Sequence, residues 1–171
     1  YFNVEREVDI YVGTFSKSLG SIGGFVSAKK SIAEYIRHKA AAFIFTAALP
    51  PASVAGVIEG LNILANDSKR RNRLHENTAH IKRAFFDMGI QVNNNQVPIV
   101  PIQIGDEALT LYMNRLLFDD GVFAGVAVSP VVPPLKAMIR TSYTCAHTKE
   151  DLGQILASFK KNLQKLGILP Q

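Results

Sequence analysis

The feature that most constrains this 171-residue chain is one lysine in a short polar turn that directly follows an apolar run. The run 10–12 (IYV) is typical of a buried strand, and residues 13–20 (GTFSKSLG) continue it as a glycine- and serine-rich loop. Open α/β sheets bind ligands where strands pass into such loops. A desolvated lysine there can lose its proton and attack a carbonyl group. We therefore interpret Lys17 as a candidate nucleophile in an α/β protein.

The residues around Lys17 distinguish a ligand site from an ordinary surface loop. Loops of Gly, Ser and Lys are common, and most lysines in them are simply solvated. Here Thr14 and Ser16 place two hydroxyl donors close to Lys17, and the amides of a glycine-bearing loop suit a phosphate. The spacing G-x-x-x-x-G-K-[ST] is absent, so the loop is not a nucleotide-binding P-loop. The residues indicate an amine beside a phosphate site.

Composition bounds the fold class but identifies no ligand. The chain is 47% hydrophobic and 19% charged, which is typical of a globular protein with one domain or two small lobes. Its net charge of +5 would favour an anionic ligand without specifying one. A single cysteine, Cys145, excludes an internal disulfide, supplies no metal site, and indicates a reducing compartment.

Neither a membrane span nor a targeting segment is predicted. The most apolar region, 40–65, is interrupted by prolines and polar residues, and no stretch approaches the ~20 apolar residues of a membrane helix. The first residues lack the pattern of a signal peptide. We therefore expect a soluble, cytoplasmic protein. Because the chain lacks an initiator Met and begins close to its first strand, we also expect it to be a piece of a longer protein.

Periodicity, glycines and prolines predict alternating strands and helices. Strands are expected over 8–14, 23–28, 97–104, 122–128 and 137–142, and helices over 31–39, 51–66, 68–88, 107–119 and 149–166. The prolines of the segment 97–104 predict an edge strand, and Thr148 begins a capping-box pattern. A change of character near residue 66 divides the chain into residues 1–66, which hold the lysine loop, and 67–171, a small α+β domain.

Three further residues are candidates for a site. Arg140 follows an apolar strand segment, and it would clamp a carboxylate, unless it is a surface arginine on an edge strand. Thr46 precedes a helix, where it either caps that helix, the reading that the residues alone favour, or contacts a phosphate. His147 lies at a strand-to-helix joint and is expected to pack that joint.

The basic run 69–73 (KRRNR) is the one sequence feature that would favour a nucleic-acid binder. It has no interleaved aromatic residues and matches no binding motif. We expect a solvated helix face and no nucleic-acid partner.

Three segments, taken together, resemble the PLP-dependent α-oxoamine synthase family, where PLP is pyridoxal 5′-phosphate. They are residues 13–18 (GTFSKS) with 23–25 (GGF), residues 45–51 (FTAALPP), and residues 133–140 (PPLKAMIR) with 146–148 (AHT). The resemblance implies the C-terminal part of a fold-type I PLP transferase. Residues 1–66 would be the end of the large-domain sheet with the start of the interdomain helix, and residues 67–171 the small C-terminal domain.

The resemblance also implies roles for individual residues. Lys17 would bind the aldehyde of PLP covalently, and Thr14 would bind its phosphate. Thr46 would contact the phosphate of the neighbouring subunit's cofactor, which implies a homodimer with shared active sites. Arg140 would anchor the substrate carboxylate. No metal is implied.

The activity implied is condensation of an amino acid with an acyl-CoA, with decarboxylation, to an α-amino ketone. The run TFSKS with GGF favours a serine palmitoyltransferase-like enzyme, and 8-amino-7-oxononanoate synthase and glycine C-acetyltransferase are the alternatives. A non-catalytic partner subunit or fragment is the alternative of another class, although it would be expected to lack Lys17. The family's other cofactor contacts lie upstream of the lysine motif, so these residues alone are expected to be inactive.

Overall fold

The computed structural model describes residues 2–170 and divides into two compact units, Tyr1–Ser68 and Lys69–Gln171. Each unit is described by itself. The assignment of residues 1–66 to the end of a larger domain stays a prediction. No helix in the described part of the chain is both long and apolar enough to cross a membrane.

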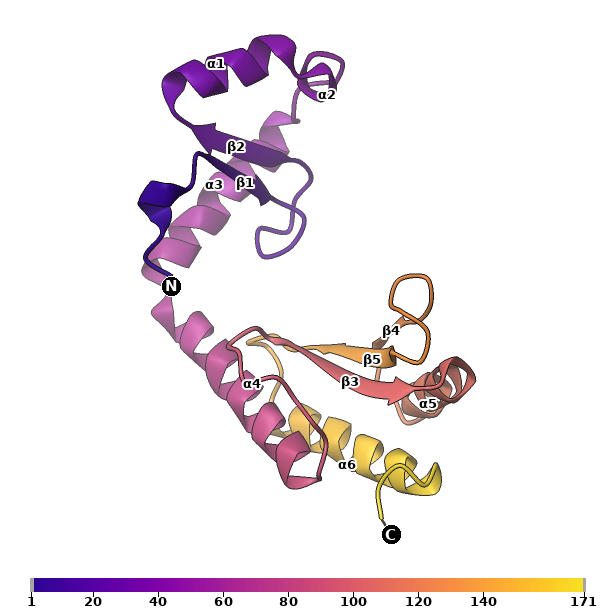
Figure 1. The fold of residues 1–171 in the computed structure, drawn as a ribbon. Coiled ribbons are helices and arrows are strands. Elements are labelled where there is room, and N and C mark those ends of the chain that lie inside the picture. The colour runs from indigo at the N-terminus through magenta and orange to yellow at the C-terminus, as the bar shows by residue number, and fades with distance from the viewer. Residues whose placement is uncertain (1, 171) are drawn as a thin grey trace. The chain divides into compact units, whose positions relative to one another are not determined.

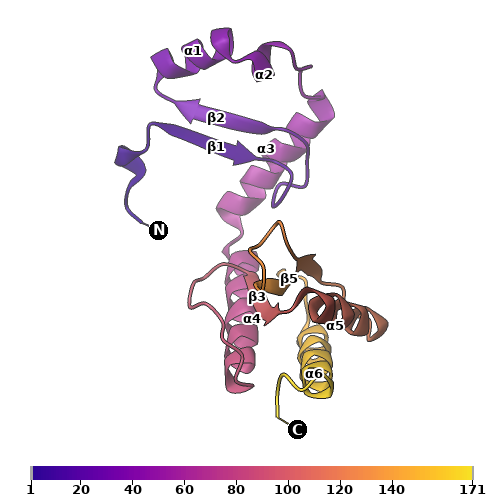
Figure 2. The same ribbon diagram turned by 45° about the vertical axis from the view of Figure 1, so that its right-hand side comes forward.

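The first unit is built on a β-hairpin (Figures 1 and 2). Strand β1 (Ile10–Thr14) pairs antiparallel with β2 (Gly24–Ala28), so that Gly13 lies opposite Phe25 and Thr14 opposite Gly24. The other elements are the short 3-10 helix η1 (Glu5–Glu7) and the helices α1 (Lys30–Lys39), α2 (Ala41–Ile44) and α3 (Pro51–Asn66). The loop that carries Lys17 is therefore the connection of this hairpin.

The expectation that residues 8–14 form a buried strand is wrong for this unit. All but one residue of β1 are exposed, and Val12 is 78% exposed. Among residues 2–68 only Val57 of α3 is buried. The physical reason is size, because a two-stranded hairpin has too few neighbours to bury both of its faces. The apolar composition of β1 is therefore not matched by packing within this unit.

The start of α3 corrects one reading of Thr46. The helix begins at Pro51, its N-cap is Pro50, and no side chain caps it. Proline is accommodated there because the first turn of a helix needs no backbone donor. Thr46 is therefore not the cap of α3, which was the reading that the residues alone favoured.

The second unit is a three-stranded antiparallel sheet with helices. Its elements are α4 (Ser68–Asp87), β3 (Ile99–Gly105), α5 (Glu107–Asp119), β4 (Gly125–Ala127), β5 (Ala137–Ser142) and α6 (Lys149–Lys165). The strand order β3-β5-β4 makes β3 an edge strand, as its prolines predict. The strand expected over 122–128 is shorter than predicted, since only Gly125–Ala127 pairs with β5.

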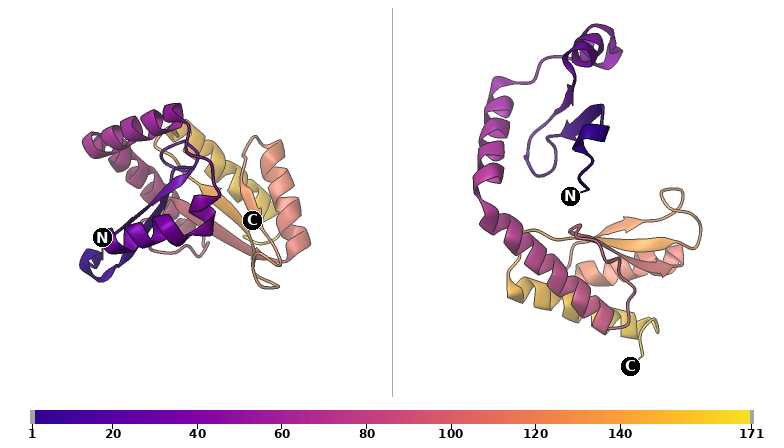
Figure 3. Two further views of the ribbon diagram at one scale, coloured as in Figure 1. Left: turned by 90° about the horizontal axis from the view of Figure 1, so that it is seen from above. Right: turned by 60° about the vertical axis from the view of Figure 1, so that its left-hand side comes forward.

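The core of the second unit lies on one face of the sheet, where α4, α5 and α6 cover it (Figure 3). Phe85 of α4 and Phe159 of α6 meet edge to face, with ring centroids 5.1 Å apart. In β5 the buried residues alternate with more exposed ones. This period-2 pattern turns Ile139 into the core and leaves Arg140 exposed on the opposite face.

Side-chain caps fix two helix starts in the second unit. Asp106 accepts a hydrogen bond from the Leu109 N–H (2.7 Å) at the start of α5. At α6, Thr148 and Asp151 each accept from the other's backbone N–H, at 3.2 and 2.8 Å. The predicted capping box is therefore confirmed.

Candidate active site

The lysine turn gathers three polar side chains at the end of β1. The hydroxyl oxygens of Thr14 and Ser16 lie 2.8 Å apart, and the Ser16 N–H donates to Thr14 Oγ1 (3.3 Å). Thr14, Ser16 and Lys17 are all exposed. The turn therefore carries two neighbouring hydroxyl groups and an exposed lysine.

Backbone hydrogen bonds hold this turn in one shape. The Phe15 N–H donates to the Gly23 carbonyl (2.9 Å), and the Ser21 N–H donates to the Phe15 carbonyl (2.9 Å). The Gly20 N–H closes a tight turn onto the Lys17 carbonyl (3.0 Å). Gly20 has a φ of +58°, a conformation that glycine adopts without a steric penalty. The backbone of Lys17 is thus fixed on both sides.

Two positions beside the lysine turn must be glycine, because atoms of the opposite strand lie too close for a side chain. A β-carbon on Gly24 would lie 2.4 Å from the Gly13 carbonyl oxygen, closer than any real contact. The ring of Phe25 instead covers the backbone of Gly13 and stacks on Phe15, with centroids 5.9 Å apart. The Gly-Gly-Phe sequence thus allows β2 and the Phe25 ring to pack closely against the end of β1, where the lysine turn begins.

Thr46 lies in the same unit but not in the lysine turn. It follows α2, and its hydroxyl donates to the Ala42 carbonyl of that helix. Its side chain is exposed. The predicted contact between Thr46 and a phosphate stays a prediction.

Arg140 lies on the central strand of the sheet in the second unit. Its neighbours across the ladder are Pro101 on β3 and Gly125 on β4. The alternative reading of a surface arginine on an edge strand is therefore wrong, because β5 is paired on both sides. Within residues 2–170 no carboxylate forms an ion pair with Arg140. Arg140 is exposed.

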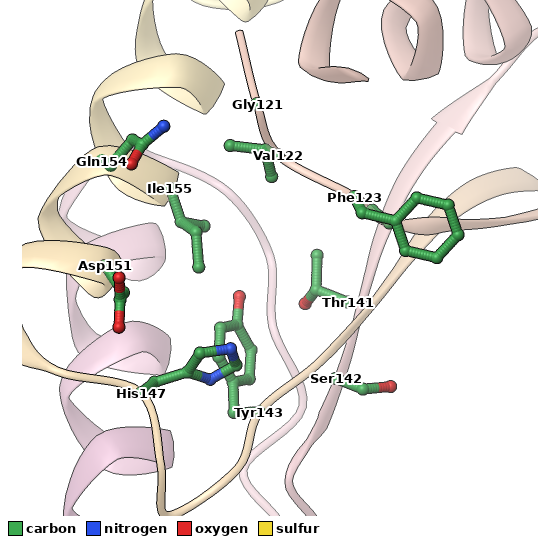
Figure 4. A pocket seen from close by; sticks show the side chains of 11 residues that line it. Gly121, Val122, Phe123, Thr141, Ser142, Tyr143, His147, Asp151, Gln154 and Ile155 are labelled. Carbon is green, nitrogen blue, oxygen red and sulfur yellow. The ribbon is translucent and has the colours of Figure 1, made fainter.

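A pocket of about 310 Å³ lies between α6 and the segment Gly121–Ala124, as Figure 4 shows, but it contains none of the predicted site residues. His147, which lines it, accepts a hydrogen bond from the Thr144 N–H at Nδ1 (3.2 Å). Its carbonyl accepts from Asn77 Nδ2 (3.1 Å), and its ring meets Tyr143 edge on. The prediction that His147 packs the joint is confirmed.

The carboxylate with the largest pKa shift is Asp120, and it helps to pack the second unit. Asp120 accepts hydrogen bonds from Ser158, Lys161 and Asn162 of α6, at 2.8, 2.7 and 2.8 Å. These bonds, with that from Lys161 the largest influence, lower the pKa of Asp120 to about 2. The cluster joins the end of α5 to α6. No group of three or more potential metal ligands occurs within the described residues.

Comparison with known proteins shows the family. The model of the family "Aminotransferase class I and II" matches residues 1–159. The chain belongs to this family.

Individual relatives refine the comparison. The chain is 40% identical over 169 residues to an 8-amino-7-oxononanoate synthase of Thermoanaerobacter pseudethanolicus, covering 99% of this chain and 43% of the relative. It is also 40% identical over 159 residues to a serine palmitoyltransferase of Bacteriovorax stolpii, covering 93% of this chain and 38% of the relative. The chain thus spans about two fifths of the length of these curated relatives.

Solved structures agree with these matches. A serine palmitoyltransferase of Sphingomonas wittichii superposes with a TM-score of 0.91 at 30% identity, covering 98% of this chain and 42% of that one. A structure described as SPT with PLP internal aldimine gives a TM-score of 0.92 at 29% identity, with the same coverage. The predicted fold class, part of a PLP transferase of the α/β type, is confirmed, and so is the resemblance drawn from the three segments.

Proposed function

We propose that this chain is part of a PLP-dependent acyltransferase that condenses an amino acid with an acyl-CoA, with loss of carbon dioxide, to an α-amino ketone. The observation that carries the proposal is the lysine turn. It carries Lys17 directly after the hydrogen-bonded hydroxyls of Thr14 and Ser16, and the Gly20 N–H closes a tight turn onto the Lys17 carbonyl. Both enzymes named among the relatives, serine palmitoyltransferase and 8-amino-7-oxononanoate synthase, support the same class of reaction.

The donor set of this turn fits PLP. An exposed amine is the group that reacts with an aldehyde, and two neighbouring hydroxyls are donors suited to a phosphate. When bound, the cofactor supplies an electron sink that makes the substrate Cα–H bond acidic. Lys17 would hold the cofactor covalently, and Thr14 would donate its hydroxyl to the phosphate. Once released, the Nζ of Lys17 would carry the Cα proton.

Arg140 would orient the amino acid. A guanidinium group binds a carboxylate through two parallel hydrogen bonds, which fixes both position and direction. The central strand supplies a rigid base for this clamp, and the absence of a side chain at Gly125 leaves room beside it. Holding the carboxylate would fix which Cα bond lies against the cofactor.

The assembly we propose is a homodimer in the cytoplasm, in which Thr46 contacts the phosphate of the neighbouring subunit's cofactor. The observation in favour of this role is that the Thr46 side chain is exposed and lies outside the lysine turn. A serine palmitoyltransferase-like activity is favoured, with 8-amino-7-oxononanoate synthase and glycine C-acetyltransferase as alternatives. Because the chain spans about two fifths of its relatives, we propose that residues 1–171 alone do not turn over substrate.

The activity is tested on the full-length protein loaded with PLP. Serine, alanine and glycine are each combined with short, dicarboxylic and long-chain acyl-CoA thioesters, and free CoA and the amino ketone are measured by mass spectrometry. We expect release of CoA that depends on one amino acid and one class of acyl chain, and that disappears in Lys17→Ala. Amino-acid-independent release, or none with any pair, would contradict the proposal.

A further inference from the structure

One face of helix α3 meets the lysine loop, residues 15–23, at two positions, Ser53 and Gly60. Ser53, Val57 and Gly60 are separated by four and three residues, so they lie on the same side of the helix. Val57, in the middle of this face, is 5% exposed and is the buried residue of α3. We call Ser53, Val57 and Gly60 the loop seat.

Two residues of the lysine loop meet the loop seat. The Ser21 hydroxyl donates to the Ser53 carbonyl (3.4 Å). A β-carbon on Gly60 would lie 3.1 Å from Cδ2 of Leu19, tighter than an ordinary van der Waals contact. Leu19 therefore occupies the space that a side chain at position 60 would need.

A third contact follows from the segment that leads into α3. Leu49 packs against Gly23, where a β-carbon would lie 2.5 Å from Leu49 Cδ2. The Gly23 carbonyl is the acceptor for the Phe15 N–H, directly after Thr14. The loop is thus supported at both ends of the stretch that contains Lys17.

Glycine at position 60 destabilises helix α3 relative to alanine, so its presence needs an explanation. Glycine in a helix interior is less favourable than alanine. Gly56 lies one turn earlier in α3, and a β-carbon there would meet nothing within 4 Å among the described residues. The two glycines therefore share the helix penalty, but only Gly60 gains close contact with the lysine loop.

We propose that Gly60 and Leu19 are positioning residues for Lys17: the missing side chain at position 60 lets Leu19 settle on α3 and so sets where the Lys17 amine is presented. The inference rests on the proposed function for the role of Lys17. Leu19 lies two residues after Lys17, inside the turn that the Gly20 N–H closes onto the Lys17 carbonyl. A displacement of Leu19 that rotation of its side chain does not absorb would therefore be passed to the backbone of Lys17.

Gly60→Ala and Gly56→Ala form a matched pair that tests this inference in the full-length protein. Both replace a helical glycine by alanine, so both should favour α3 similarly. Only Gly60→Ala should speed amide hydrogen exchange in residues 17–21 of the cofactor-free protein. It should also shift the pH dependence of the absorption of lysine-bound PLP and lower kcat by about three- to tenfold, since small misplacements at a reacting centre are costly. The KM for the amino acid should change little.

A double variant tests whether Leu19 is the side chain that Gly60→Ala displaces. Gly60→Ala combined with Leu19→Val, which shortens the side chain in the way, should return exchange and kcat toward the wild-type values. If Gly60→Ala and Gly56→Ala behave alike in exchange and in kcat, the positioning role is wrong. If Gly60→Ala fails to fold, Leu19→Val alone must still speed exchange in residues 17–21, and unchanged exchange would overturn the inference.

The proposed function can fail independently of this inference. Wild-type protein that carries no PLP on Lys17 would contradict the proposed function. The exchange comparison on cofactor-free protein would then still show whether the loop seat positions the loop.

Discussion

Phe25 lies so close over Gly13 that a β-carbon on Gly13 would sit 2.2 Å from Cε1 of the ring. The two residues are paired across the hairpin, one residue before the strand end that leads to Lys17. The lysine turn therefore depends on a position without a side chain in the strand that precedes it.

Gly13→Ala should consequently disturb both stability and the site. The new methyl group forces the ring of Phe25 aside, and overpacking of this kind costs about 1–3 kcal/mol. We expect a lower melting temperature of the full-length protein together with weaker PLP binding. Gly153→Ala in α6, where a β-carbon meets nothing within 4 Å in the part of the chain that the structure describes, is the control and should not lower stability.

A double variant identifies the cause. Gly13→Ala combined with Phe25→Ala removes the ring that the methyl group displaces. Its destabilisation should be smaller than the sum of the two single effects. Strict additivity would show that Phe25 is not the obstacle.

Arg140→Ala should weaken amino-acid binding and leave the cofactor in place. Loss of charged hydrogen bonds worth about 1.5–3 kcal/mol corresponds to roughly a ten- to hundredfold fall in kcat/KM for the amino acid. Arg140→Lys should recover only part of the loss, because an ammonium group cannot form the paired bonds. Lys160→Ala, which also removes an exposed charge in the second unit, is the control. Loss of PLP absorption in Arg140→Ala would assign Arg140 to the cofactor instead.

Tyr143→Phe should be tolerated. The Tyr143 hydroxyl is buried without a hydrogen-bond partner in the described chain, since the Thr141 hydroxyl donates to the Val100 carbonyl. Burial raises the pKa of Tyr143 to about 12, and Thr141 acts in the opposite direction. Removing an unsatisfied buried hydroxyl eliminates its desolvation cost. The free energy of unfolding, measured in urea, should stay the same or rise by up to about 1 kcal/mol. A clear decrease would reveal a partner of the hydroxyl in solution.

Acid should weaken the joint between α5 and α6 through Asp120. The pKa of Asp120 is about 2 in the folded chain, below its usual value of 3.8. Folding therefore favours the ionised form, and the stabilisation is complete above about pH 4–5 and is lost as the pH falls toward 2. Asp120→Asn should flatten this part of the pH-stability curve relative to wild type. Parallel curves for the two proteins between pH 5 and 2 would contradict the assignment.

The features that the sequence predicts correctly in this chain depend on local signals. The capping box at Thr148, the edge position of β3 and the packing role of His147 were all predictable, because each depends on neighbouring residues or on proline chemistry. The exposure of β1 and the central position of Arg140 were not. Both depend on which strands pair, which no short segment reveals.

The candidate site also has one part that the sequence predicts and one part that only the structure shows. The grouping of Thr14, Ser16 and Lys17 follows from their adjacency in the sequence. The contact of Leu19 with Gly60 spans 41 residues, and its only sequence signal is a glycine inside an otherwise regular helix. That signal also occurs at Gly56, where it has no such partner, so only the structure separates the two positions.

The identity of the lysine that carries PLP is the most direct test of the account. The full-length protein is loaded with PLP, reduced with borohydride and digested, and the modified peptide is sequenced by mass spectrometry. The account predicts a single phosphopyridoxyl group on Lys17, and none on Lys29 or Lys30, the next lysines along the chain. PLP attached to any other lysine, or a protein that binds none, would contradict it.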